Sequence, residues 1–357
     1  MRRAALVCVC LLAVLLPTGG VATAAHGPEA SGSATVSAAR SWAATDISTV
    51  LAAGVMGPDE ETFRPDDDLT RGELYDALML LGQTPMPPAE PARSVTMREL
   101  DAKLVTALGL GPAAWRIRVA LRDAGLQPTA FVGTETVARL LALRVNHPQS
   151  EEWLERGPNM PASRAEAAYS LARVLVLLPE KVTWIDDLAT SLSMPELTDW
   201  QRSVVTRAVR FVGFPYVFAG TSERPQKLWG ANGTLVDAPG GFDCSGLVWR
   251  VFKTQPFAEA PQLASVLRGR TTYEMSGEVP ATRRIPRDSL EPGDIMFFGA
   301  KGVASRPSEV GHSALYVGNG WFVHSSGSGV TLHPIDGWYS TSFAWARRPL
   351  AEAGLVA

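Results

Sequence analysis

The residues of this chain best suited to chemistry are one cysteine and two histidines in its C-terminal half. Cys244 stands in the segment "GGFDCSGLVWRVF", and the other two cysteines, Cys8 and Cys10, lie within the first ten residues. Asp243 is placed to cap a helix that begins at Cys244, where the helix dipole and free backbone N–H groups stabilise a thiolate. This position predicts a lowered thiol pKa and a nucleophile. A buried small side chain and an intermolecular disulfide are the other interpretations of such a cysteine.

The two histidines, His312 and His324, lie in "GHSALYVGNGWFVHSS", which is typical of a β-hairpin turning at residues 318–320. A two-residue loop would pair His324 with residue 315 and place the imidazoles on opposite faces. A three-residue loop, with a left-handed glycine at its end, would pair His324 with residue 314 and place both imidazoles on one face. We expect the three-residue loop.

A thiol beside two imidazoles predicts nucleophilic catalysis. His312 would accept the thiol proton and later donate it to a leaving amine, and His324 would orient His312 and fix its tautomer. Taken singly, each histidine is equally consistent with a structural or surface role. A zinc site is a further alternative, but one cysteine and two histidines lack a compact ligand spacing here. We expect neither a metal nor a cofactor.

The elements that must position these side chains begin near Asp199, where the composition changes. The segment "DWQRSVVTRAVRFVG" has the apolar spacing of an amphipathic helix and leads into "FPYVFAG" and then to Cys244. Residues 221–241 separate "FPYVFAG" from the cysteine segment, and Asn232-Gly233 within them favours a small hairpin.

Five motifs in this half carry a resemblance: "FPYVFAG", "FDCSGLVWRVF", "RTTYEM", "LEPGDIMFFG" and "GHSALYVGNGWFVHS". In this order they resemble the NlpC-type family of cell-wall cysteine peptidases, which look like circularly permuted relatives of papain. The resemblance implies an α+β fold in which the helix carrying the nucleophile packs on an antiparallel sheet. It also implies that Cys244 is the nucleophile, His312 the base and His324 the third, polar member of the site.

Three more residues match positions beside the nucleophile in that family. Tyr216 would hydrogen-bond the thiolate or the oxyanion, or would only pack its strand. Asp243 and Ser245 would help shape the substrate groove, although Asp243 is equally placed to act as a helix cap alone.

The front half contains repeated helix starts. "DLTRGELYDAL" has Thr70 and Glu73 in a capping box, and Ser163 and Glu166 take the same places in "PASRAEAAYSL". A vaguer copy is expected between them at "VGTETVARLLAL". Stacked helical repeats are typical of a binding array.

The first of these units resembles the S-layer-homology motif, with a tryptophan, then "AAGVMG", "FRP" and "LTRGEL". The resemblance implies attachment to a polymer of the Gram-positive cell wall. A helical spacer without a ligand is the alternative. Residues 66–68 are three aspartates, which we interpret as a solvated turn rather than a calcium loop.

The N-terminus, "MRRAALVCVCLLAVLLPTGGVATAA", has the basic, apolar and small-residue order of a secretory signal. We therefore expect a signal peptide at 1–24, a flexible segment at 25–41, an all-α repeat domain at 42–180, a linker at 181–198 and the peptidase domain at 199–350. Loss of Arg2 and Arg3 would take the formal charge from −3 to −5. An acidic chain without a basic tract argues against a nucleic-acid partner.

Together these features predict a secreted, wall-associated hydrolase of a Gram-positive-type bacterium, without a membrane anchor after signal cleavage. Its substrate would be the peptide stem of peptidoglycan; by the resemblance, the bond is the one from D-glutamate to a diamino acid. An amidase or acyltransferase of the same fold is one alternative. A non-catalytic surface adhesin is the other, but intact cysteine and histidine residues argue against it.

Overall fold

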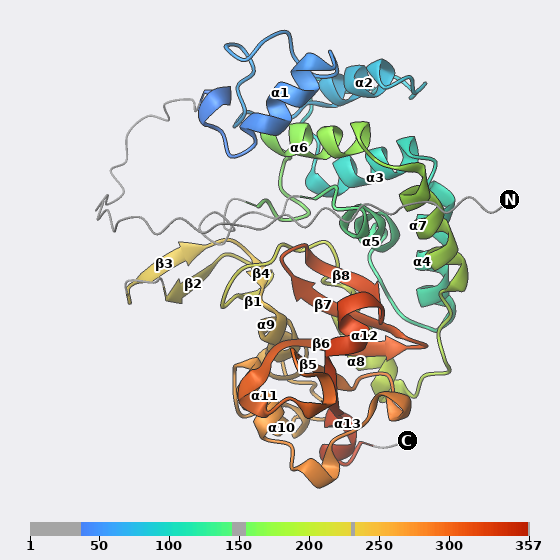
Figure 1. Cartoon of the computed structure of the whole chain (residues 1–357), viewed down its shortest axis with the longest axis vertical. Helices are drawn as coiled ribbons and strands as arrows, with labels where there is room; N and C mark the ends of the chain where they lie inside the picture. The colour runs from blue at the N-terminus through green and yellow to red at the C-terminus, as the bar shows by residue number, and fades with distance from the viewer. Residues whose placement is uncertain (1–36, 145–154, 230–232, 356–357) are drawn as a thin grey trace, which may run out of the picture. The chain divides into compact units, whose positions relative to one another are not determined.

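A computed structural model describes residues 37–144, 155–229 and 233–355 of the 357-residue chain. The expected signal peptide and most of the segment 25–41 lie outside the described residues. Within 25–41, Ala38–Arg40 forms a short 3₁₀ turn, and Ala38 is buried. Helices come first along the chain and an antiparallel sheet follows, as the α+β expectation requires (Figure 1).

In the described residues before Asp199, the helices are α1 (Ala44–Ala52), α2 (Arg71–Leu80), α3 (Met97–Ala107), α4 (Gly111–Asp123), α5 (Val132–Leu140), α6 (Arg164–Leu175) and α7 (Pro179–Ser191). The predicted capping box of α2 is present, because the Thr70 side chain accepts from the Glu73 N–H while the Glu73 carboxylate accepts from the Thr70 N–H. Ser163 caps α6 in the same way by accepting from the N–H of Glu166.

The third copy of this helix start is not where the sequence placed it. Helix α5, which occupies the expected segment "VGTETVARLLAL", begins after Phe131 without a side-chain cap. The matching capping box belongs to α3, where Thr96 and Glu99 bond reciprocally. The prediction of this copy at "VGTETVARLLAL" was therefore wrong. The segment "VTMREL", which carries the capping box, was overlooked because it keeps the Thr-x-x-Glu spacing but lacks the rest of the pattern.

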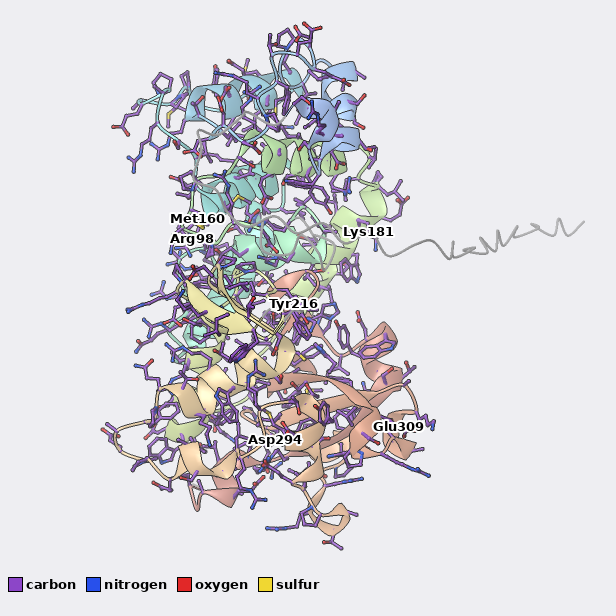
Figure 2. All side chains as sticks on the ribbon, turned by 90° about the vertical axis from the view of Figure 1, so that its left-hand side faces the viewer. Arg98, Met160, Lys181, Tyr216, Asp294 and Glu309 are labelled. Atoms are coloured by element: carbon purple, nitrogen blue, oxygen red, sulfur yellow. The ribbon has the colours of Figure 1, made fainter. Side chains whose placement is uncertain are left out.

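The three capped helices start side by side. Single antiparallel backbone bridges join the segments before these helices; the paired residues are Asp68 with Ser163, Thr70 with Ser94, and Thr96 with Pro161. Ion pairs join one capped helix to the next. Arg164 at the start of α6 pairs with Glu73 on α2, and Arg71 on α2 pairs with Glu99 on α3 at 2.8 Å. Figure 2 labels Arg98 and Met160, which lie together because the segment before α6 runs along the start of α3. The repeats are thus tied to one another at their caps.

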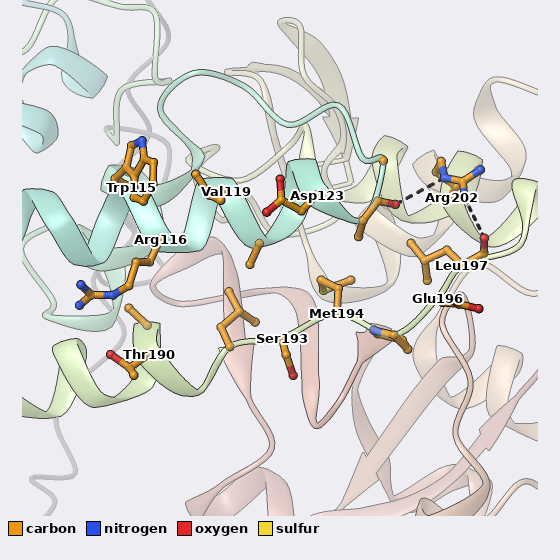
Figure 3. Close-up of a pocket in the computed structure, with 16 residues that line it drawn as sticks. Trp115, Arg116, Val119, Asp123, Thr190, Ser193, Met194, Glu196, Leu197 and Arg202 are labelled. Atoms are coloured by element: carbon orange, nitrogen blue, oxygen red, sulfur yellow. Dashed lines mark hydrogen bonds between the residues drawn. The ribbon is translucent and has the colours of Figure 1, made fainter.

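The segment expected as a linker, 181–198, begins inside a helix. Pro179 sits in the first turn of α7, which continues to Ser191, and only residues 192–198 lie outside a helix. Arg116 on α4 pairs with Asp186 on α7. Between α4 and residues 189–197 lies a hollow of about 850 Å³, with Trp115 and Met194 on its walls (Figure 3). A packed helix therefore takes up most of the expected linker.

The C-terminal half contains α8 (Asp199–Val209), α9 (Cys244–Trp249), α10 (Leu263–Val266), α11 (Thr272–Gly277), α12 (Gly337–Ser342) and α13 (Pro349–Glu352). Its strands are β1 (Thr221–Ser222), β2 (Gln226–Trp229), β3 (Leu235–Ala238), β4 (Gly241–Phe242), β5 (Ile295–Gly299), β6 (Val310–Gly318), β7 (Trp321–Ser326), β8 (Gly329–Pro334) and β9 (Phe343–Arg347).

Five strands form one antiparallel sheet in the order β8-β7-β6-β5-β9, and α9 packs against β6 and β7. The papain-like arrangement expected from the sequence, a nucleophile helix on an antiparallel sheet, is present. Strands β2 and β3 form a separate hairpin within residues 221–241, before Cys244. One buried apolar cluster extends from Ala38 in the helical half to Leu350 near the C-terminus.

The β6–β7 hairpin places its residues on the expected faces by a different turn. Leu315 pairs with Val323, so residue 314 lies opposite His324 as predicted. The loop itself has two residues, Asn319 and Gly320, with φ of 46° and 82°. Val317 is an extra residue in β6, because the register shifts between residues 316 and 318. This bulge supplies the residue that we had assigned to a longer loop.

Among the described residues, no single helix has the length and hydropathy of a membrane span; only α3 and α4 taken together, with a 120° bend between them, pass that test.

Candidate active site

Helix α9 begins at Cys244, and Asp243 caps it as predicted by accepting from the N–H of Gly246. Gly246 is required there, because a Cβ at this position would lie 1.8 Å from the carbonyl oxygen of Gly220. The chain before Cys244 therefore crosses directly over the first turn of α9. The residue Cys244 keeps part of its surface exposed.

The structure brings the two predicted histidines together. Nε2 of His312 on β6 lies 3.0 Å from Nδ1 of His324 on β7, and the rings stand nearly perpendicular, at 88°. His324 is buried, whereas His312 is partly exposed. With its Nε2 engaged, His312 has Nδ1 as its remaining ring nitrogen.

Aromatic side chains surround the imidazole pair. Phe298 packs beside His312, and Phe322 packs beside His324. Tyr339 on α12 contacts both rings, with centroids 5.9 Å and 5.0 Å away. This apolar setting fixes ring positions and excludes water from one side of the pair.

Burial keeps both imidazoles uncharged at neutral pH. Burial, with a smaller effect from the charge of His333, lowers the pKa of His312 to about 4. The pKa of His324 lies well below its usual 6.5 because of burial and then the charges of His312 and His333. Neutral imidazole is the form that accepts a proton, so His312 is in the state required of a base.

The thiol differs from the sequence-based expectation. Burial raises the pKa of Cys244, and the charge of Asp243 raises it further. Hydrogen bonds with Thr272, whose Oγ1 lies 3.4 Å from Sγ, and with Ser313 offset only part of the rise. The prediction of a lowered pKa was therefore wrong: α9 has only six residues, and its capping group is itself an anion. The resting pair is a neutral thiol and a neutral imidazole.

Asp243 and Ser245 are joined by an arginine that the sequence analysis did not single out. Arg270 donates to the Asp243 carboxylate at 3.0 Å and to Ser245 Oγ at 2.6 Å. It also donates to the carbonyl of Ala219, at 3.1 Å, and so links the segment that follows Tyr216 to the helix start. The guanidinium partly neutralises the carboxylate beside the thiol.

Tyr216 lies beside the nucleophile segment. It forms a parallel bridge with Phe242, two residues before Cys244, and its side chain is half-buried. Figure 2 shows it between the helical half and the sheet. All six predicted site residues are thus gathered around the start of α9 and the facing strands β6 and β7.

Four further residues of the site were missed: Thr272, Ser313, His333 and Tyr339. Thr272 belongs to the motif "RTTYEM", and Ser313 directly follows His312, so the motifs themselves pointed to both residues. His333 and Tyr339 carried no local signal, because only the pairing of β8 with β7 and the position of α12 bring them to the imidazoles. In the described part of the chain, no three His, Cys, Asp or Glu side chains are arranged to hold a metal ion.

The chain is similar to known proteins in two regions. Residues 213–348 match the model of the NlpC/P60 family, and residues 37–74, which precede them, match the model of the S-layer homology domain. Similar proteins include a bifunctional muramidase/DL-endopeptidase of Bacillus subtilis, 28% identical over 142 residues, which are 40% of this chain and 34% of that protein. A murein DD-endopeptidase of Escherichia coli is 29% identical over 155 residues, which are 42% of this chain and 46% of that protein. The chain thus spans between a third and a half of the length of these relatives.

Among solved structures, the P60 domain of an antigen from Mycobacterium avium subspecies paratuberculosis is 27% identical, with a TM-score of 0.30. The match covers 42% of this chain and 93% of that one. Both curated relatives named above carry the word endopeptidase in their names.

Proposed function

We propose that this protein hydrolyses an amide bond in the peptide stem of peptidoglycan, with Cys244 as the nucleophile and His312 as the base. The observation that carries the proposal is the neutral imidazole pair, His312 Nε2 to His324 Nδ1 at 3.0 Å, on the strands that α9 packs against. The names of the curated relatives support peptidoglycan as the substrate.

The reaction begins with proton transfer. In the tautomer that suits catalysis, His312 Nε2–H donates to His324 Nδ1, so that Nδ1 of His312 is free to accept the thiol proton. The thiolate then attacks the amide carbon. Because burial raises the thiol pKa, we infer that proton transfer accompanies the attack rather than preceding it.

The oxyanion that forms would accept a hydrogen bond from the Cys244 N–H at the start of α9, with Tyr216 as a second donor. The His312 imidazolium returns its proton to the leaving amine, which departs and leaves a thioester on Cys244. Water deprotonated by His312 attacks the thioester, and the products are a carboxylate and the regenerated thiol. His324 acts through His312, and Asp243 and Ser245 border the groove through their contacts with Arg270.

The preferred bond within the stem is the one from D-glutamate to the diamino acid, and the helical repeats would hold the protein on a cell-wall polymer. The S-layer homology match at 37–74 supports wall attachment. The protein would act outside the cell, at the wall of a Gram-positive-type bacterium.

The test uses purified peptidoglycan and the full chain. Wild type, Cys244→Ala and a matched surface variant, Ser191→Ala on α7, are incubated with sacculi, and new amino and carboxyl termini are identified by mass spectrometry. We expect stem fragments from wild type and Ser191→Ala and none from Cys244→Ala. Fragments released equally by Cys244→Ala would refute the assignment of the nucleophile. Wall binding without fragments from any variant would favour the adhesin.

A further inference from the structure

The described part of the chain contains a large cavity whose lining is strongly basic. It has a volume of about 1060 Å³ and lies between α8, the segment 221–224 and the chain that follows α9. Five arginines line it, together with one carboxylate: Arg98, Arg207, Arg210, Arg224, Arg250 and Glu223. The whole chain carries a formal charge of −3, so this concentration of positive charge is local.

The carboxylate does not neutralise the cavity. Glu223 is engaged mainly by Arg250, through two hydrogen bonds of 2.8 Å from Nε and Nη2, and the charge of Arg224 acts on it more weakly. Arg98 pairs outside the lining, with Glu135 at 3.5 Å. Among the described residues, neither Arg210 nor Arg224 forms an ion pair, and both are exposed.

Arg207 shows the consequence of this imbalance. Its guanidinium donates to the carbonyls of Val251 and Gln255, at 2.8 Å and 2.6 Å, and lies 3.4 Å from the ring centroid of Phe257. Burial and the charge of Arg250 lower the pKa of Arg207 to about 10. A bound anion would relieve the repulsion between these two guanidinium groups.

The other walls fit a sugar. The lining includes the half-buried rings of Phe214 and Phe257, and an apolar ring face suits the C–H face of a sugar, although Arg207 already covers one face of Phe257. Hydroxyl and amide groups, among them Ser203 and Asn159, are placed to bond sugar hydroxyls. The cavity is also far larger than one phosphate or carboxylate needs, which indicates a ligand of several units.

We propose that this cavity binds a segment of an anionic glycan, with the arginines on its carboxylate or phosphate groups and the phenylalanines against its sugar rings. Guanidinium groups bind both oxyanions in the same bidentate manner, so the two kinds of anion share one chemistry here.

The cavity adjoins the elements that lie on either side of Cys244 in the chain. Thr221 pairs with Phe242, which immediately precedes Asp243 and Cys244. Arg250 directly follows α9, about 9 Å along the helix axis from Cys244. A glycan in the cavity would therefore lie against both elements that flank the thiol. Under the proposed function, on which this step rests, the cavity is a second contact with the wall beside the groove that binds the stem.

The binding test uses the full chain carrying Cys244→Ala, so that turnover plays no part. Calorimetry is done with oligogalacturonate, a phosphomannan fragment, neutral maltopentaose and inorganic phosphate, each at low and at moderate salt. The test variant is Arg210→Gln/Arg224→Gln, since both side chains are exposed and their loss should leave the fold intact. The control is Arg122→Gln/Arg283→Gln, which removes the same charge from exposed positions outside the cavity.

We expect one or both anionic glycans to bind, with an affinity that falls as salt rises. The test variant should lose about tenfold or more in affinity, and the control should be unchanged. Binding of only one of the two anionic glycans identifies the anion as carboxylate or phosphate. The proposal is overturned if neither anionic glycan binds, if maltopentaose binds equally well, if inorganic phosphate alone binds as tightly as the glycans, or if the control loses as much affinity as the test variant.

Discussion

Arg139 joins the helical half of the protein to the strands of the candidate active site, and replacing it should weaken both. Its buried guanidinium, carried on α5, donates to the carbonyls of Gly213 at 2.8 Å, Phe214 at 3.1 Å and Ser328. It also pairs with Glu155 at 2.9 Å. Gly213 and Phe214 lead to Tyr216, and Ser328 lies in the turn after the strand that carries His324.

The change we consider is Arg139→Met, which keeps an unbranched apolar stem and removes every donor. Breaking a buried ion pair by removing one partner costs about 3–5 kcal/mol. Glu155 keeps a second partner, Arg144 at 3.3 Å, and Phe214 O still accepts from the Val330 N–H. These remaining bonds place the expected loss of unfolding free energy near the lower end, at about 3 kcal/mol.

The assay is urea unfolding followed by tryptophan fluorescence, with Arg122→Met on the exposed face of α4 as the control. The control should change the unfolding free energy by no more than about 0.5 kcal/mol. Turnover of the folded Arg139→Met protein should also fall, because the segments that hold Tyr216 and His324 lose their anchor. A stability loss below about 1 kcal/mol, or equal losses in both variants, would show that Arg139 does not tie the two halves together. A fragment of residues 199–357 that is as stable as the whole chain would show the same.

Three more predictions follow from the buried groups. Alkylation of Cys244 by iodoacetamide should accelerate only above the ordinary thiol pKa of about 8.5, because burial raises the pKa; a plateau reached below that pH would contradict the raised value. Burial raises the pKa of Glu135 from 4.5 to about 7, so its contribution to stability is present below pH 4.5 and is lost as the pH rises to 7. Glu135→Gln should therefore raise the unfolding free energy above pH 7 by about 3 kcal/mol and should give no gain near pH 4.5. His324→Ala should retain weak turnover and His324→Asn should recover part of it, since an amide accepts the same hydrogen bond from His312; equal turnover in both variants would argue against an orienting role.

Features set by local spacing were predictable from the sequence. The caps at Asp243 and Ser163, the capping box at Thr70, and the faces of His312 and His324 all depend on residues a few positions apart. The hairpin was right in its faces and wrong in its turn, because a bulge at Val317 and a three-residue loop shift the register equally.

Features set by distant contacts were not predictable. The thiol pKa depends on burial beneath neighbouring segments and on the charge of Asp243, whereas the sequence showed only the helix start. His333 and Tyr339 reach the imidazoles through strand pairing and α12. The contacts of Arg139 span 74 and 189 residues of sequence, so the helical half and the C-terminal half looked more separate in the sequence than they are.

The central claim is that Cys244 attacks the substrate and carries it as a thioester. The most direct measurement is acid-quenched, single-turnover mass spectrometry of the full chain with a soluble stem peptide, using wild type and Cys244→Ala. Wild type should gain the mass of the acyl fragment on the peptide containing Cys244, hydroxylamine should remove it, and Cys244→Ala should form neither adduct nor product. Product formed by Cys244→Ala at the wild-type rate, with Cys244 of the wild type unmodified throughout turnover, would contradict the claim.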